Sequence, residues 1–249
     1  MRERILAMGG PGSGKTYTWL KLASYYQTRH PDATFYVIDS EIGAERSLLE
    51  FPGLTNVKVF PVVDWKEYRE AQKTIAKKCT EYDWVVLDMA DKAWTAVQRY
   101  YIEEIFNQQD MGDYFLEARK KLKKDAKSLF AGRDAALKGW TDWPVVNRLY
   151  EDFIFPLVYR IPANLFMATA GQAVSEEDAE NIRDLYGPHG IRPAGQKNLP
   201  YQPDTVLLLT HKQGGYYITT VKDRGGRSYF DHQKLINFPI QYGKIAGWL

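Results

Sequence analysis

Eight consecutive residues near the start of the chain have the types and spacing of a phosphate-binding loop. They are Gly9, Gly10, Pro11, Gly12, Ser13, Gly14, Lys15 and Thr16. Glycines let the backbone curl so that several N–H groups point at one anion, and the N-terminus of a following helix adds positive potential. The lysine ammonium can then reach the β- and γ-phosphates of a nucleoside triphosphate, and the threonine hydroxyl can ligate Mg²⁺. The pattern therefore predicts a site for ATP, or a related triphosphate, with Mg²⁺.

A glycine-rich turn could match this pattern by chance, so the flanking residues matter. Arg4–Met8 is a short apolar segment typical of a strand, and it runs directly into the glycines. Lys15–Tyr26 places apolar side chains on one helical stripe. A strand before the loop and a helix after it are the context that a phosphate-binding loop requires, and they favour the functional interpretation.

The elements after the loop predict an α/β fold with a mostly parallel sheet flanked by helices. Further strands are expected at Thr34–Asp39, Asn56–Val62, Trp84–Leu87 and Ala163–Ala170, with an amphipathic helix at Trp65–Lys78. Two late segments, Thr205–Thr210 and Tyr216–Val221, flank a glycine turn and predict a β-hairpin. We expect one domain over residues 1–249, with a helical insertion at 92–150 and a long mobile loop at 173–200, where Gly, Pro and polar residues are frequent.

Two carboxylates lie at the ends of predicted strands, where they could serve the phosphate site. Asp88 follows Trp84–Leu87, and the phosphate-binding loop favours it as the aspartate that holds Mg²⁺; the alternative is an ordinary strand-terminal aspartate that caps the next helix. No glutamate follows Asp88 directly, so a water-activating carboxylate must come from elsewhere. Glu41, after Thr34–Asp39, could polarise the attacking water. It could instead belong to a cap for the helix expected at Ala44–Glu50.

Taken in order, these motifs resemble the core of RecA-type P-loop ATPases. The likeness is closest to the compact RecA-like ATPases of phages that are associated with single-strand annealing and recombination. The resemblance implies that Glu41 is the general base. It also implies that Gln172 senses the γ-phosphate and leads into a DNA-binding loop. The segment 92–150 departs from the family because it is longer and more helical.

A late pair of cations extends this resemblance. Lys222-Asp223-Arg224 is similar to the Lys-x-Arg element of RecA-like hexameric helicases. In that family the two cations reach the γ-phosphate held by the neighbouring subunit, as arginine fingers do. The resemblance therefore implies a homo-oligomer, ring or filament, in which Lys222 and Arg224 act in trans. The alternative is that both side chains lie on a solvated turn.

The overall charge does not indicate a nucleic-acid partner, because 33 basic residues are balanced by 31 acidic ones. A local basic run with nearby aromatic residues does resemble a single-stranded DNA surface, although such runs are often solvated helix faces. Its cations are Arg119, Lys120, Lys121, Lys123, Lys124, Lys127, Arg133 and Lys138, and its aromatics are Tyr114, Phe115, Phe130 and Trp140. Arg183, His189, Arg192 and Lys197 form a second candidate surface.

Other features of the sequence bear on disulfides, membrane insertion and metal binding. The single Cys79 excludes an intrachain disulfide and is typical of a reducing compartment. No apolar run has the length of a membrane span, so we expect no membrane partner and a cytoplasmic protein, in the host cytoplasm if it is virus-encoded. The four histidines have no metal-ligand spacing, so no structural metal is expected.

The leading hypothesis is an oligomeric ATPase coupled to single-stranded DNA in recombination or annealing. One alternative is a monomeric nucleoside or nucleotide kinase that uses the helical insertion as a lid. A DNA translocase or packaging-type motor is a second alternative, and a nucleotide-sensing assembly protein without turnover is a third.

Overall fold

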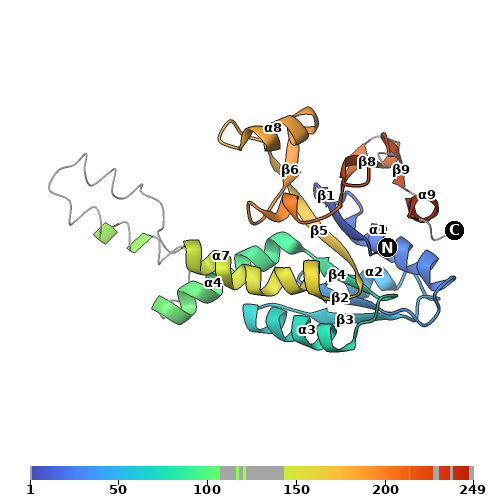
Figure 1. Cartoon of the computed structure of the whole chain (residues 1–249), viewed down its shortest axis with the longest axis horizontal. Coiled ribbons are helices and arrows are strands. Elements are labelled where there is room, and N and C mark those ends of the chain that lie inside the picture. The colour runs from blue at the N-terminus through green and yellow to red at the C-terminus, as the bar shows by residue number, and fades with distance from the viewer. Residues whose placement is uncertain are drawn as a thin grey trace.

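The structure is a computed structural model that describes residues 2–106, 116–117, 120–121, 143–212, 214–226, 230–235 and 238–246. Within these residues one mixed sheet forms the centre of the molecule (Figure 1). Its strands lie in the order β3-β2-β4-β5-β1-β7-β8-β9, and β6 pairs with the end of β5. Helices cover both faces, as expected for an α/β fold.

The parallel part of the sheet brings the predicted site residues to one edge. Its strands are β1 (Arg4–Gly9), β2 (Phe35–Asp39), β3 (Val57–Pro61), β4 (Trp84–Asp88), β5 (Asn164–Ala173) and β7 (Thr205–Lys212). β5 lies between β1 and β4, so one strand separates the phosphate-binding loop from Asp88. This order and the flanking helices confirm the predicted α/β fold with a mostly parallel sheet.

The C-terminal hairpin extends the sheet beyond β7. β8 (Gly215–Asp223) pairs antiparallel with β7, and β9 (Gln233–Lys234) pairs antiparallel with β8. The predicted hairpin is therefore confirmed. Because β7 runs parallel to β1, the hairpin tip lies at the same edge as the phosphate-binding loop, and the end of β8 lies at the opposite edge.

The helices divide between the two faces of the sheet. On one face lie α1 (Lys15–Gln27) and α9 (Phe238–Ile245), with the short α2 (Ala44–Leu48) beside α1. The other face carries α3 (Trp65–Lys78), α4 (Ala90–Phe106) and α7 (Trp143–Phe155), followed by a π-helical turn at Pro156–Arg160. Most of α4 and of α7 falls within residues 92–150, where the helical insertion is expected, and most of the residues between the two helices lie outside the described ones.

Successive residues of the central strand enter opposite cores. Leu6 and Met8 of β1 pack in the core under α3, α4 and α7, whereas Ile5 and Ala7 pack in the core under α1 and α9. A strand buried on both faces must be apolar throughout, which explains the continuous apolar run in the sequence. The same reason accounts for the buried patterns of β2 and β4.

Two sequence-based expectations need correction. β5 continues three residues past the predicted strand end at Ala170, because Gly171–Ala173 pair with β6 (Ile191–Pro193). The segment 173–200, expected to be a loop, contains α8 (Glu180–Tyr186), β6 and short 3₁₀ turns at 187–189 and 199–201. Its buried side chains, Ile182, Tyr186 and Leu199, join the core on the α4 face. Residues 171–201 are called the β5–β6 arm below.

Within the part of the chain that the structure describes, none of the helices is both long and apolar enough to cross a membrane.

Candidate functional site

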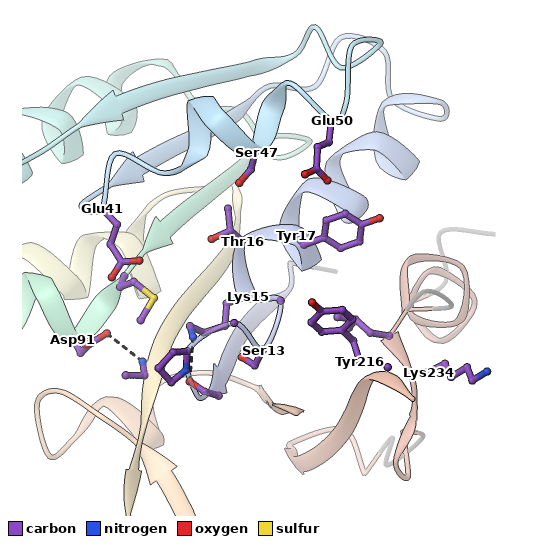
Figure 2. A pocket seen from close by; sticks show the side chains of 18 of the residues that line it. Ser13, Lys15, Thr16, Tyr17, Glu41, Ser47, Glu50, Asp91, Tyr216 and Lys234 are labelled. Carbon is purple, nitrogen blue, oxygen red and sulfur yellow. Dashed lines mark hydrogen bonds between the residues drawn. The ribbon is translucent and has the colours of Figure 1, made fainter. Parts of the chain in front are cut away.

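A cavity of about 970 Å³ opens at the carboxyl edge of the parallel strands (Figure 2). The phosphate-binding loop forms its floor, and the ends of β2, β4 and β5 and the hairpin tip surround it. Its lining includes Gly9, Pro11, Gly12, Ser13, Gly14, Lys15, Thr16, Tyr17, Glu41, Ser47, Glu50, Met89, Asp91, Lys92, Ala170, Tyr216 and Lys234. The carboxyl edge of a parallel sheet is where open α/β folds place their ligands.

The backbone of the loop explains why glycines occur where they do. Gly12 and Gly14 have φ values of 67° and 93°, a left-handed conformation that side chains disfavour. At Gly9, an added Cβ would lie 2.4 Å from the carbonyl oxygen of Leu209, so only glycine fits beside β7. α1 begins at Lys15 without a side-chain cap and without an acidic residue in its first turn. Its first N–H groups and its dipole are therefore available to an anion.

Lys15 is held inside the loop that it follows. Its Nζ donates to the carbonyl oxygens of Gly9 and Gly10, at 3.1 Å and 3.0 Å. Burial lowers the pKa of this ammonium, and the nearby carboxylates, chiefly that of Asp88, oppose the change. A partly desolvated cation is attracted strongly by a multiply charged anion, because the surrounding dielectric is low.

Asp88 lies beside Thr16, as the predicted Mg²⁺ site requires. The Thr16 hydroxyl and the Trp19 indole N–H both donate to Oδ2 of Asp88, each at 2.9 Å. The carboxyl is only 4% exposed, and this burial raises its pKa, while the two hydrogen bonds act in the opposite direction. A buried carboxylate next to a hydroxyl fits a divalent cation whose charge would compensate the burial.

The burial of Asp88 predicts that Asp88→Asn stabilises the ligand-free protein at neutral pH. Both donors bind one oxygen, and an amide oxygen can accept both bonds. A raised pKa means that the folded state binds the proton more readily, so ionised Asp88 costs stability above that pKa. The cost disappears as pH falls to the ordinary aspartate pKa of about 4.

Thermal unfolding without nucleotide or metal measures this effect. The variant should melt above the parent at neutral pH, and the gap should close towards about pH 4. Asp32→Asn, at an exposed position, is the matched control, and it should melt at the same temperature as the parent both at neutral pH and at about pH 4. A lower melting temperature for Asp88→Asn at neutral pH would contradict the assigned electrostatic cost.

The sequence left open whether Glu41 belongs to a cap for the helix that begins at Ala44, and in the structure Glu41 does not have that role. The neighbouring Asp39 performs that role, because its Oδ2 accepts from the Ala44 N–H at 2.9 Å and its Oδ1 from the Glu41 N–H at 3.1 Å. The Glu41 side chain is exposed and lines the cavity. It is close enough to Lys15 to act on the pKa of that ammonium. The carboxylate therefore lies in the same cavity as the phosphate-binding loop.

Asp91 is a cavity residue that the sequence analysis did not select. Its Oδ1 accepts from the Ala170 N–H at 3.3 Å and lies 3.3 Å from the Thr169 hydroxyl oxygen, whose single proton has a nearer acceptor in the Ala194 carbonyl oxygen at 3.0 Å. The Asp91 side chain thus lies beside Thr169 and Ala170 of β5, next to the loop (Figure 2). One signal was present in the sequence: Asp91 follows Asp88 by three residues, so the first turn of α4 returns it to the same edge.

The three other predicted catalytic residues lie outside the cavity lining. Gln172 is exposed on the β5–β6 arm, because β5 continues past the cavity edge at Ala170. Lys222 and Arg224 lie at the opposite edge of the sheet, level with the start of β7. Within one chain these two cations cannot join the phosphate-binding loop.

Both cations have partners on their own chain. Lys222 Nζ donates to the carbonyl oxygens of Pro200 and Pro203, each at 3.0 Å, and burial lowers its pKa. Arg224 donates to the Tyr201 carbonyl oxygen at 2.7 Å and is half exposed. Arg224 is thus the more accessible of the two.

The oxygen set at the loop fits Mg²⁺. The ion prefers a few protein oxygens together with substrate phosphates, and the paired Thr16 hydroxyl and Asp88 carboxylate are donors of that kind. Among the described residues there is no cluster of three or more His, Cys, Asp or Glu side chains that could hold a metal without a substrate.

The structure describes the second candidate DNA surface but only a small part of the first. Most of the basic run Arg119–Lys138 lies outside the described residues, and Lys120 and Lys121 are exposed. On the arm, Arg192 is paired with Asp178 at 2.9 Å. Residues 175–197 also carry five carboxylates, which weakens any attraction for a phosphate backbone. They are Glu176, Glu177, Asp178, Glu180 and Asp184.

Comparison with known proteins shows the family to which the chain belongs. No curated protein matches the sequence. Among solved structures, a KaiC-like protein from the hyperthermophilic archaeon Pyrococcus horikoshii OT3 aligns with 92% of this chain and 82% of its own, at 10% identity and a TM-score of 0.43. The family model described as AAA domain matches residues 1–130. That match includes the phosphate-binding loop, Glu41 and Asp88 and spans just over half of the chain, so the chain belongs to the AAA domain family.

Proposed function

We propose that the protein hydrolyses ATP at the cavity above Gly9–Thr16 and couples hydrolysis to single-stranded DNA. The observation that carries the proposal is the arrangement around the loop: Lys15, Thr16 and the Glu41 carboxylate line one cavity, and the buried Asp88 accepts a hydrogen bond from the Thr16 hydroxyl. Lys15 and the helix N-terminus would bind the phosphates, and Thr16 and Asp88 would hold Mg²⁺. When bound, Mg²⁺ neutralises the charge that develops on the phosphoryl oxygens.

Glu41 fits the role of the group that accepts a proton from water. The Glu41 side chain is exposed in the cavity. Asp39, rather than Glu41, accepts the hydrogen bonds from the backbone N–H groups of residues 41 and 44. Asp91 is a weaker candidate, since one of its oxygens already accepts a hydrogen bond from the Ala170 N–H of β5. In-line attack by water would form a bond to the γ-phosphorus and break the bond from that phosphorus to the β,γ-bridging oxygen, so that ADP leaves with the electron pair and the water proton passes to Glu41.

We propose further that a second copy of the chain completes the site with Arg224. The single-chain cavity has Lys15 and Lys92 as cations near the carboxylates, and Arg224 lies at the far edge of the sheet. If Arg224 contacts a nucleotide, its distance from the loop of its own chain means that the nucleotide must be held by another subunit, as with trans-acting arginine fingers. The Lys222 ammonium donates to two backbone carbonyl oxygens of its own chain, so we propose that Lys222 positions the end of β8, which carries Arg224.

Single-stranded DNA is proposed as the partner on the basis of charge. The basic run Arg119–Lys138 combines cations with aromatic residues, the composition of surfaces that track phosphates and stack bases. The β5–β6 arm is the weaker candidate for binding DNA, because its carboxylates repel a phosphate backbone. The resemblance of the sequence motifs to those of annealing and recombination ATPases is a second argument for this proposal.

Phosphate release by the purified chain tests this proposal. The rate should rise more steeply than linearly with protein concentration, because the complete site needs two copies, and single-stranded DNA should increase it. A rate strictly proportional to protein and unaffected by DNA would contradict the proposed coupling. Transfer of phosphate to an added nucleoside, rather than to water, would identify a kinase instead.

The role of Glu41 predicts a loss of turnover without a loss of binding. Glu41→Gln should lower kcat by about a hundredfold, at the lower end of the range for a general base, and leave the Kd for Mg-ATP close to that of the parent. Glu45→Gln is the matched control, since Glu45 is exposed on α2 and does not line the cavity. Full turnover in Glu41→Gln would remove the general-base assignment and leave the fold and the loop unaffected.

A further inference from the structure

The nucleotide cavity has a second end that the proposed hydrolysis does not use. Glu41 and Asp91 lie at one end, Lys15 lies between, and Tyr17 and Tyr216 lie at the other end (Figure 2). If hydrolysis occurs as proposed, the γ-phosphate must lie near Glu41 and Asp91. The triphosphate then runs along the loop, and the nucleoside is directed towards the two tyrosines.

Tyr216 is held in place before any ligand arrives. It lies near the tip of the β7–β8 hairpin opposite His211, and the two rings stack with centroids 4.4 Å apart at an interplanar angle of 9°. A Cβ on Gly14 would lie 3.5 Å from Cδ1 of Tyr216, so the ring packs directly against the phosphate-binding loop. The residue is still 46% exposed, although His211 covers one face of the ring. A preordered ring loses little conformational entropy when a ligand stacks on it.

Tyr17 forms the facing wall from the first turn of α1. Its ring packs against Phe51 with centroids 5.4 Å apart, and the ammonium of Lys21 lies 5.3 Å from its centroid. Tyr17 is 39% exposed and lines the same cavity. Two aromatic walls, one from α1 and one from the hairpin, therefore bound this end.

The polar side chains at this end are not buried, as they would be in a site that distinguishes bases by hydrogen bonds to the base edges. Glu50 and Lys234 line the cavity but are exposed, and Ser47 is partly exposed. Strong discrimination between bases requires buried polar groups that a wrong base would leave unpaired. Stacking instead is tolerant of base identity and is stronger for the larger purine ring.

We propose that Tyr216 is the stacking platform for the nucleobase, with Tyr17 closing the opposite side. The site then takes purine nucleoside triphosphates, ATP and GTP alike, in preference to pyrimidine nucleotides. The proposal rests on the proposed function for the direction of the nucleotide.

Equilibrium titrations with Mg-ATP, Mg-CTP and magnesium tripolyphosphate test it. Tyr216→Leu should weaken ATP binding by about tenfold and CTP binding by less, and should leave tripolyphosphate, which has no base, unchanged. Tyr217→Leu is the matched control: this neighbouring tyrosine stacks on His232 at 4.4 Å and lies outside the cavity lining. Tyr216→Trp, which keeps an aromatic face, should bind ATP as well as the parent.

The outcomes separate this proposal from the proposed hydrolysis. Unchanged ATP affinity in Tyr216→Leu would overturn the platform, and so would an equal loss for tripolyphosphate, which would mean that the substitution acts on the loop. A parent chain that binds ATP through Tyr216 but releases no phosphate would support the platform and contradict hydrolysis. A parent that binds neither ATP nor tripolyphosphate would overturn both.

Discussion

Replacing Lys15 with alanine should reduce phosphate release by about a thousandfold, the upper range for loss of one preorganised electrostatic group. The ammonium is partly desolvated and held by the Gly9 and Gly10 carbonyl oxygens at the centre of the cavity. It is therefore positioned for the β- and γ-phosphates before they bind. Steady-state phosphate release at saturating Mg-ATP, with a parallel binding titration, measures both consequences. The Kd for Mg-ATP should rise as well, because Lys15 contacts the phosphates in the ground state.

A second lysine on the same helix provides the control for Lys15→Ala. Lys21 lies on α1 beside Tyr17 and Phe51 but does not line the cavity. Lys21→Ala should keep turnover within about twofold of the parent, as expected for a surface substitution away from the site. Equal losses in the two variants would mean that the helix, rather than the Lys15 ammonium, had been disturbed. Turnover retained in Lys15→Ala would contradict the assignment of the loop as the site of hydrolysis.

Replacing Arg224 with alanine should lower turnover by about a thousandfold, the lower end of the range for a trans-acting arginine finger. The nucleotide affinity of the isolated chain should stay unchanged, since Arg224 lies at the edge of the sheet opposite the loop. Measured together, kcat and Kd distinguish a finger from a binding residue. The separation of the two effects is the signature of a group that acts only in the transition state.

The control for Arg224→Ala is an exposed arginine with no proposed role. Arg29, which packs over the Tyr25 ring at the end of α1, meets this condition, and Arg29→Ala should retain full turnover. Arg224 also pairs with Asp204 and bonds the Tyr201 carbonyl oxygen, so its loss could loosen the end of β8. Thermal unfolding of Arg224→Ala should therefore show a shift of a few degrees at most, consistent with an exposed ion pair. Unchanged turnover would contradict the finger assignment.

The sequence was sufficient where a function depends on adjacent residues. The phosphate-binding loop is a contiguous pattern, and its left-handed glycines follow from the same local geometry that the pattern encodes. Asp88 could be placed because it ends a short apolar strand next to the sheet centre. Glu41 was found in the same way, although the choice between a cap and a cavity residue needed the Asp39 hydrogen bonds.

The remaining parts of the site depend on contacts between distant segments. Tyr216 belonged to a predicted hairpin, but its place above Gly14 follows from β7 pairing beside β1, which no local pattern specifies. The β5–β6 arm was missed for a related reason. Its Gly- and Pro-rich sequence is typical of loops, whereas Ile182 and Tyr186 are fixed by burial against the rest of the core. Tertiary packing there overrode the local signals.

A mixing experiment tests most directly whether two copies share one hydrolytic site. Glu41→Gln and Arg224→Ala should each be nearly inactive alone. In an equimolar mixture, some neighbouring pairs combine an intact Glu41 from one chain with an intact Arg224 from the other. The account predicts that phosphate release recovers in the mixture to a substantial fraction of the parent rate. A mixture no more active than the sum of its separate components would contradict the shared site.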